Sequence, residues 1–287
     1  MLDWSIIAPI IISGLLLGGI YAMIAQGLNL MWGVLRVINF AHGEFMMLGC
    51  YTTFWLVTRY KMPFLVTPLV AFLGVGVLGF SIYMVVIKPI LGWEELEFNS
   101  LLIFFGFGLI MVTIARILWS PTYRIVPVDF GSIEPGGIFL SLNYLIPFVI
   151  SLVVTVLLYL FLRRTYLGKS VRAVVQNKDS ATIMGINPDF VYGLTFIIGC
   201  GVAAIGGSLI SLIYSIFPDM GHGFILLAFC IVCLGGLGSF WGVFIAGLAV
   251  GLIESFVGAF AGPQWEPIVV AVLLLIVLPI RSFFAAR

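Results

Sequence analysis

Three polar residues that can exchange hydrogen bonds or protons, Asn39, His42 and Glu44, stand where an apolar segment begins. Gly33 and Gly43 lie beside them. A carboxylate in or near hydrocarbon is costly and usually faces protein or water. Glu44 could therefore pair with His42, cap a broken helix or line a polar path. A cap or a bond between helices is the more ordinary role, and the sequence leaves the path-lining role open.

Two amide side chains, Gln26 and Asn29, lie in the preceding apolar segment. Residues three apart share one face of a helix. Gln26 and Asn29 could therefore line a polar cavity together, or they could bond to a neighbouring helix.

Four ionisable residues stand apart from these groups. Glu254 lies within an apolar run, and Arg116 could complement its charge across a helical bundle, so the sequence suggests that the two pair. Asp219 and His222 flank a short turn, FPDMGHG, where we expect solvated side chains.

Catalytic patterns are absent from the sequence. It contains no GxxxxGK[ST] phosphate loop, no HExxH and no GxSxG, and its two histidines have no partners at zinc-binding spacing. Cys230 and Cys233 form a CxxC without a second pair, which is typical of small residues packed in helices. We expect no catalytic residue, no metal site and no cofactor on this chain.

The composition predicts the elements that carry these residues. Of 287 residues, 62% are hydrophobic and 9% are charged, against about a quarter charged in soluble domains. Apolar runs near 20 residues predict an all-α, polytopic transmembrane bundle of eight or nine segments, some of them broken. We expect one domain over 1–287. The candidate spans are 6–31, 40–58, 64–87, 99–119, 142–162, 191–215, 222–237, 240–260 and 266–281.

The long polar stretch 163–189 separates two such runs and must be an aqueous loop. It predicts two short helices. The first runs over 167–176, with Lys169 and Arg172 on its polar side. In the second, Asp179 or Ser180 caps a turn that continues to Met184.

The end of that second helix is also signalled. Gly185 can supply the left-handed residue that terminates it, and Pro188 is expected to prevent a restart. Its apolar side would present Ala181, Ile183, Met184 and Ile186. Such a surface suits either a partner's groove or the lipid headgroups.

Charge asymmetry predicts the orientation, because short cytoplasmic loops carry the excess of Lys and Arg. With 163–189 inside, nine basic residues fall inside: Arg36, Lys88, Arg163, Arg164, Lys169, Arg172, Lys178, Arg281 and Arg287. Four fall outside or near the outer end: Arg59, Lys61, Arg116 and Arg124. The N-terminus is then external, as is the 120–141 loop. The first residues, MLDWSIIAPI, are expected to begin a retained span rather than a cleaved signal peptide.

Small residues recur at four-residue spacing in Gly14/Gly18, Gly238/Gly242 and Gly247/Gly251. Such pairs let helix backbones approach closely, either within one subunit or between subunits.

Three stretches resemble one family. LGKSVRAVVQNKDSATIMGIN (167–187) resembles the cytoplasmic loop of ABC-importer permeases of the branched-chain amino acid (LivH) type. QGLNLMWGVLRVINFAHGEFMMLGCY (26–51) and LGGLGSFWGVFIAGLAVGLIES (234–255) are similar to its N-terminal and glycine-rich C-terminal signatures. The chain departs from the family near 88–98, where WEELE replaces a basic linker, and in the 120–141 loop.

The resemblance implies roles for two groups of residues. Coupling to an ATPase would involve Lys169, Arg172, Asp179, Ala181, Met184 and Gly185. The translocation path or a structural signature would involve Gln26, Asn29, Asn39, His42, Glu44, Gly235, Gly236 and Gly238.

The resemblance also implies a function and partners. The chain would be a permease in a bacterial-type cytoplasmic (inner) membrane, importing branched-chain or other hydrophobic amino acids. An external solute-binding protein, a second permease and two ATP-binding subunits would complete the machine. ATP and magnesium would bind those partners, and no basic tract suggests nucleic acid. Urea, amides or other amino acids are alternative cargoes, and a secondary transporter is the alternative of a different class.

Overall fold

The structure is a computed structural model that describes the backbone of residues 4–134 and 139–285 and the side chains of 7–134 and 139–276. Residues 1–3, used above for the signal-peptide argument, and Arg287 lie outside the described residues, as does the side chain of Arg281.

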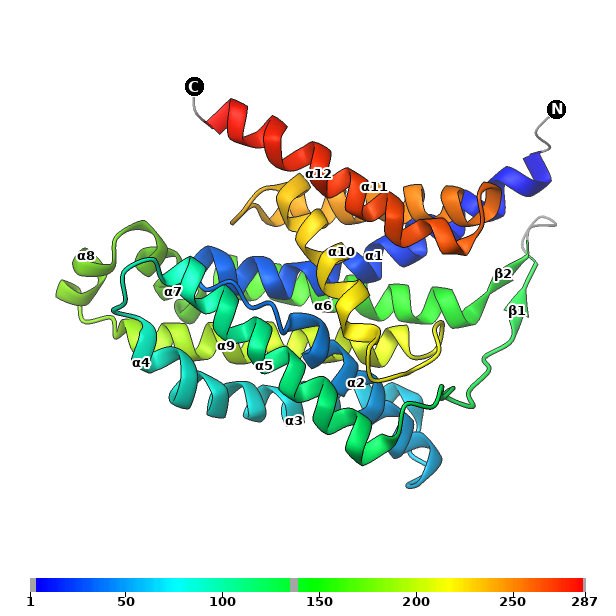
Figure 1. Ribbon diagram of the computed structural model, residues 1–287, viewed down its shortest axis with the longest axis horizontal. Helices are drawn as coiled ribbons and strands as arrows, with labels where there is room; N and C mark the ends of the chain where they lie inside the picture. Colours follow the sequence, from blue (N-terminus) through cyan, green and yellow to red (C-terminus); the bar gives the residue numbers. More distant parts are fainter. Residues whose placement is uncertain (1–3, 135–138, 286–287) are drawn as a thin grey trace.

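Helices account for nearly all of the described chain (Figure 1). They are α1 (Trp4–Leu35), α2 (His42–Thr58), η1 (Phe64–Val66), α3 (Thr67–Ile82), η2 (Tyr83–Ile87), α4 (Lys88–Ile90), α5 (Leu96–Trp119), α6 (Leu142–Arg164), α7 (Tyr166–Gln176), α8 (Lys178–Ile183), α9 (Pro188–Ile210), α10 (Met220–Gly235), α11 (Phe240–Phe260), η4 (Pro263–Trp265) and α12 (Glu266–Ala285). Two short strands, β1 (Ser132–Ile133) and β2 (Leu140–Ser141), pair antiparallel, with Ser132 opposite Ser141.

Six helical segments of the described chain are long and apolar enough to cross a membrane. They are Ile7–Leu35, Phe64–Ile90, Leu96–Trp119, Leu142–Arg164, Pro188–Ile210 and Phe240–Phe260. Two shorter apolar helices, Met220–Gly235 and Pro263–Ile276, and the 17-residue α2 account for the other predicted segments. The expected helical bundle is confirmed, and α2 and α10 are its short members.

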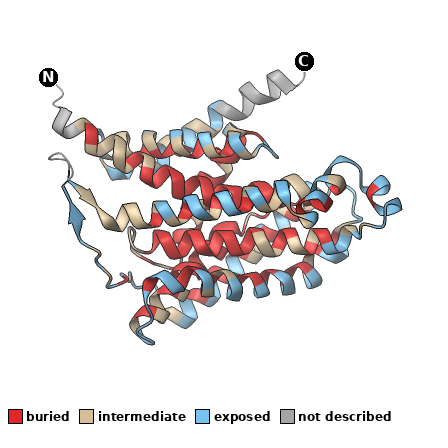
Figure 2. Cartoon of the chain, turned by 180° about the vertical axis from the view of Figure 1, so that it is seen from behind, coloured by how far each residue is buried: buried red, intermediate tan, exposed pale blue. Residues whose placement is uncertain are grey.

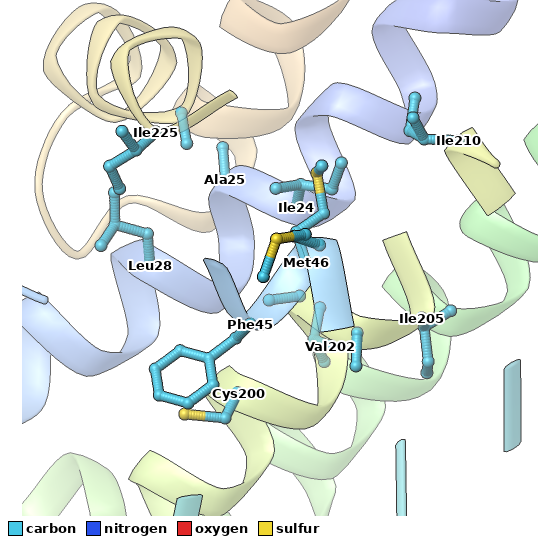
Figure 3. Packing of buried hydrophobic residues seen from close by; sticks show 14 of the residues in the cluster. Ile24, Ala25, Leu28, Phe45, Met46, Cys200, Val202, Ile205, Ile210 and Ile225 are labelled. Carbon is cyan, nitrogen blue, oxygen red and sulfur yellow. The ribbon is translucent and has the colours of Figure 1, made fainter. Parts of the chain in front are cut away.

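The core forms around α9, which packs against α1, α2 and α3. Buried residues are concentrated in these central helices (Figure 2). The outer faces of α5 and α6 are largely exposed. Figure 3 shows how the helices meet: Ile24 from α1, Phe45 and Met46 from α2, Cys200 from α9 and Ile225 from α10 converge on one cluster. Because α1, α2 and α3 all contact α9, most of its residues are buried.

Two of the three small-residue pairs allow close packing between helices of this chain. A Cβ on Gly14 would lie 2.9 Å from Leu252 Cα, and one on Gly18 would lie 2.8 Å from the carbonyl oxygen of Gly247. The first and third GxxxG pairs therefore face each other across the α1–α11 contact. This close approach supports packing within one subunit for these two pairs.

The two long polar loops lie at opposite ends of the molecule. Figure 1 shows α7 and α8 at one end and the β1–β2 hairpin at the other. The hairpin end also holds the segment between α9 and α10, where the backbones of Arg124 and Ile216 pair through two hydrogen bonds of 2.9 and 2.8 Å. This separation is what the charge argument requires of a loop inside and a loop outside.

Candidate functional site

The first helix of the polar loop, α7, matches the predicted segment. The Thr165 side chain caps it by accepting a 3.0 Å hydrogen bond from the Gly168 backbone N–H. Val171 and Val174 are buried on one face, and Lys169 is exposed on the other. Arg172 is also exposed, but its guanidinium donates to the Leu162 carbonyl near the end of α6. It therefore ties α7 to the membrane helix that precedes it.

The expected cap of α8 at Asp179 or Ser180 is wrong. Asn177 is the cap, and its Oδ1 accepts a 2.8 Å hydrogen bond from the Ser180 backbone N–H. The extended backbone of Asn177 sets its side chain in front of the helix, whereas Asp179 already lies in the first turn.

At the C-terminal end of α8, the prediction for Gly185 agrees with the structure and the prediction for Pro188 does not. Gly185 has φ +83°, the left-handed conformation that ends the helix. Pro188 does not prevent a restart, because it is the first residue of α9, capped by Asn187. Proline suits that position, since the first N–H of a helix needs no partner within the helix.

The apolar residues of α8 do not form one exposed face. Ala181 is 4% exposed and packs with Val171, Val174 and Val191, while Ile183 and Met184 are 87% and 84% exposed. Ile183 is two positions from Ala181, about 200° around the helix. Met184 is the C-cap, where the helical backbone has already ended. Ala181 therefore anchors the helix, and Ile183 and Met184 are left for contact with something else.

The polar side chains of the Asn39–Glu44 segment form one local turn and two contacts with other helices. Asn39 Oδ1 accepts from the Ala41 N–H at 3.1 Å and turns the chain into α2. His42 Nε2 lies 3.0 Å from the Ile24 carbonyl oxygen on α1. All of these side chains are buried. His42 thus faces α1 and does not pair with Glu44.

Glu44 instead pairs with a residue that was expected in a solvated turn. Its Oε1 lies 3.5 Å from Nδ1 of His222 on α10, and Glu44 is 2% exposed. Asp219 also has a partner, because Arg116 donates to both of its carboxylate oxygens. The suggested Arg116–Glu254 pair is therefore wrong: the α9–α10 turn brings Asp219 to Arg116, and Glu254 lies elsewhere, near Tyr21.

Gln26 and Asn29 hold the glycine-rich turn between α10 and α11. Gln26 Nε2 donates to the Phe240 carbonyl at 2.6 Å, and Asn29 Oδ1 accepts from the Gly238 N–H at 2.8 Å. Gly236 and Gly238 have φ +99° and +76°, which residues with side chains rarely adopt.

Gly235 completes this turn in a different way, by close packing. A Cβ there would lie 2.5 Å from the carbonyl carbon of Gly242. The Gly238/Gly242 pair therefore serves the turn and not a face between two helices.

Among the cavities that border α1, two are lined by buried polar residues of that helix. One, of about 630 Å³, lies beside α7 and is lined by Gln26, Asn29, Arg163, Arg172 and Trp241 among others. Gln26 and Asn29 thus fit both of their predicted roles, as cavity lining and as bonds between helices.

The other cavity, of about 430 Å³, lies towards the hairpin end and is lined in part by Tyr21, Tyr214, Glu254 and Glu266. The sequence did not single out Tyr21, Tyr214 or Glu266. A tyrosine amid the apolar residues of the first span was the one signal available. The predicted site residues are therefore spread over three places: the α7–α8 end, the α2 start and the α10–α11 turn.

Comparison with known proteins identifies the family. The family model described as "Branched-chain amino acid transport system / permease component" matches residues 10–278. The chain is 30% identical to the high-affinity branched-chain amino acid transport system permease protein BraD of Pseudomonas aeruginosa, over 94% of this chain and 92% of that protein. It is also 30% identical to the permease protein LivH of Escherichia coli K12, over 93% and 91% of the two chains.

A more distant relative is archaeal. The probable branched-chain amino acid transport permease protein LivH of Methanocaldococcus jannaschii is 26% identical, over 82% of this chain and 76% of that protein. No solved structure is significantly similar to the chain. With its helical bundle and its match over nearly the whole length, this multi-pass membrane protein is a transport subunit and belongs to the family of permease components of branched-chain amino acid ABC transport systems.

Proposed function

We propose that this chain imports branched-chain or other hydrophobic amino acids, which an external solute-binding protein delivers to it. Two ATP-binding subunits supply the energy, and a second permease, identical or similar, completes the path. The proposal rests on family membership and on the α7–α8 end, which has the form of a docking surface.

The exposed tip of α8 is the observation that carries the proposal. Ile183 and Met184 project from a helix whose other apolar residue, Ala181, is fixed against α7 and α9. An apolar tip on an anchored helix suits insertion into a groove of a soluble partner. A push on that tip would reach α9, the most buried helix, through the Val191 contact.

We further propose that this end faces the cytoplasm and that the hairpin end meets the solute-binding protein. The excess of Lys and Arg around α7 and α8 supports this orientation. ATP and the loaded receptor together must then favour the outward-open form by a few kcal/mol, since a ligand shifts an equilibrium only through its differential affinity.

Co-purification tests the docking surface. Met184→Glu should abolish retention of the ATP-binding subunits on the tagged permease, because a charge replaces the exposed apolar tip. Gly185→Pro should do the same, because proline cannot adopt φ +83°. Ile125→Glu is the matched control: Ile125 is 70% exposed, but at the opposite end.

Retention of the ATPases by Met184→Glu, or leucine uptake by liposomes that hold only this chain, would overturn the proposal. Cargo is tested separately, by measuring which solutes bind the cognate receptor. If the receptor binds urea, amides or polar amino acids instead of leucine, isoleucine and valine, the proposed cargo is wrong. The docking result does not depend on this outcome.

A further inference from the structure

A cavity of about 430 Å³ opens between α1, α10, α11 and α12, next to the 211–219 segment. This volume lies within the range of small-molecule sites. Apolar side chains, including Met220 and Leu227, form much of its wall. Its polar groups are the hydroxyls of Tyr21, Tyr214 and Ser215 and the carboxylates of Glu254, Glu266 and Asp219. The Asp219 carboxylate is already paired with Arg116, which lies outside the lining.

Glu254 leaves one oxygen without a partner. The residue is 8% exposed, and its Oε2 is buried with no hydrogen-bond partner among the described residues. Tyr21 lies beside it, and the Tyr21 hydroxyl is 3.1 Å from the Tyr214 hydroxyl. A buried carboxylate left in this way is costly unless another group supplies a donor or a positive charge.

The protein itself does not supply that charge in the part of the chain described. The residues lining the cavity include no lysine, arginine or histidine, and neither Glu254 nor Glu266 has a basic atom within 4.0 Å there. Glu44 provides the contrast: it is also buried with one oxygen unpartnered among the described residues, but its other oxygen faces His222. The difference indicates that the partner of Glu254 comes from outside the chain.

We infer that this cavity binds the α-ammonium group of the amino acid cargo, with the Glu254 carboxylate as its acceptor and the Tyr21–Tyr214 hydroxyl pair beside it. The apolar wall formed by Met220 and Leu227 would then hold the branched side chain. Glu266 adds negative charge at the same cavity. The inference rests on the proposed function, since it assumes that the cargo is an amino acid.

The position of the cavity fits a first acceptor site. Tyr214 belongs to the segment between α9 and α10, at the same end as the hairpin. Another cavity along α1, lined by Gln26 and Asn29, lies towards α7. Tyr21 and Gln26 are five residues apart, about 7.5 Å along the helix, so α1 borders both cavities in succession.

Protection from a hydrophobic carbodiimide tests the inference on the complete wild-type transporter in nanodiscs. Dicyclohexylcarbodiimide modifies carboxyl groups in apolar surroundings, and mass spectrometry can follow each site. L-Leucine and 3-methylbutylamine, which both carry an ammonium group, should slow modification of Glu254 several-fold. 4-Methylpentanoate has the leucine skeleton without the ammonium and should give no protection. Modification of Glu44 is the internal control and should not respond to any of the three.

Equal protection by 4-methylpentanoate, or protection by potassium ions alone, would overturn the inference, as would no protection by leucine. In proteoliposomes with saturating loaded receptor, Glu254→Gln should lower leucine import at least about tenfold, because the lost bond is to a charged group. Receptor-stimulated ATP hydrolysis should persist, which a misfolded variant could not achieve. Glu94→Gln removes the same charge at an exposed site and should leave both rates unchanged.

Import at the wild-type rate by Glu254→Gln would also reject the inference. If Glu254→Gln loses both leucine import and ATP hydrolysis, the carbodiimide protection of the wild-type transporter decides whether Glu254 binds the ammonium group. If the wild-type transporter hydrolyses ATP but imports no amino acid, the proposed function fails instead, so the two failures are distinguishable.

Discussion

At the scale of single residues, Glu44 and Glu254 show how one residue type acquires two roles. Both are carboxylates in apolar helices, and both are almost fully buried. Glu44 bonds across the α2–α10 contact to His222, whereas Glu254 faces a cavity without a basic partner among the described residues. The expected role of Glu44 as a bond between helices fits its surroundings, and its role in transport stays a prediction.

The Glu44–His222 pair makes a stability prediction. His222→Ala should lower the apparent free energy of unfolding by about 1–3 kcal/mol, because it leaves a buried carboxylate without its partner. Glu44→Gln combined with His222→Ala should recover part of this loss. Thermal unfolding in detergent measures both, and strictly additive effects would contradict a direct interaction.

At the scale of elements, α8 depends on its cap, because six residues cannot sustain a helix by themselves. Asn177→Ala should destabilise α8 by about 1 kcal/mol and weaken binding of the ATP-binding subunits about fivefold. Ser180→Ala should have little effect, since Ser180 contributes its backbone N–H and not its hydroxyl to the cap. Titration of the permease with the purified ATPases measures both affinities. If Ser180→Ala weakened ATPase binding more than Asn177→Ala, the cap predicted from the sequence would be supported instead.

The α1–α11 contact makes a second prediction at this scale. Gly251→Leu should lower the free energy of unfolding by at least about 1 kcal/mol, because the new side chain meets the backbone of α1 at Gly18. Gly106→Leu on α5 is the control, because nothing lies within 4 Å of its Cβ position. Unfolding in detergent should separate the two variants, and equal loss would indicate that α1 and α11 are not in close contact.

At the scale of the whole molecule, the arrangement of the two ends makes a topology prediction. The four native cysteines, Cys50, Cys200, Cys230 and Cys233, are buried, which keeps the background of thiol labelling low. In intact cells, a membrane-impermeant maleimide should label Ile125→Cys and spare Met184→Cys. Inverted vesicles should give the opposite result. Labelling of position 184 from outside would reverse the proposed orientation.

The helical bundle, the positions of its segments and the two-helix form of the polar loop could all be predicted from the sequence. These features follow from local properties: long apolar runs must satisfy their backbone hydrogen bonds as helices, and Gly185 can adopt a left-handed conformation at no steric cost. The three motifs, read as a resemblance, also pointed to the family that the comparisons then established.

Which polar groups face one another could not be predicted and became visible in the folded chain. Arg116 and Glu254 have opposite charges, but the fold brings Asp219 to Arg116 and leaves Glu254 at a cavity with Tyr21 and Tyr214. The same holds for Glu44 and His222, which are 178 positions apart in sequence but 3.5 Å apart in space. Charge and hydropathy are properties of single residues, whereas a contact depends on how whole helices cross, and local sequence patterns do not reveal those crossings.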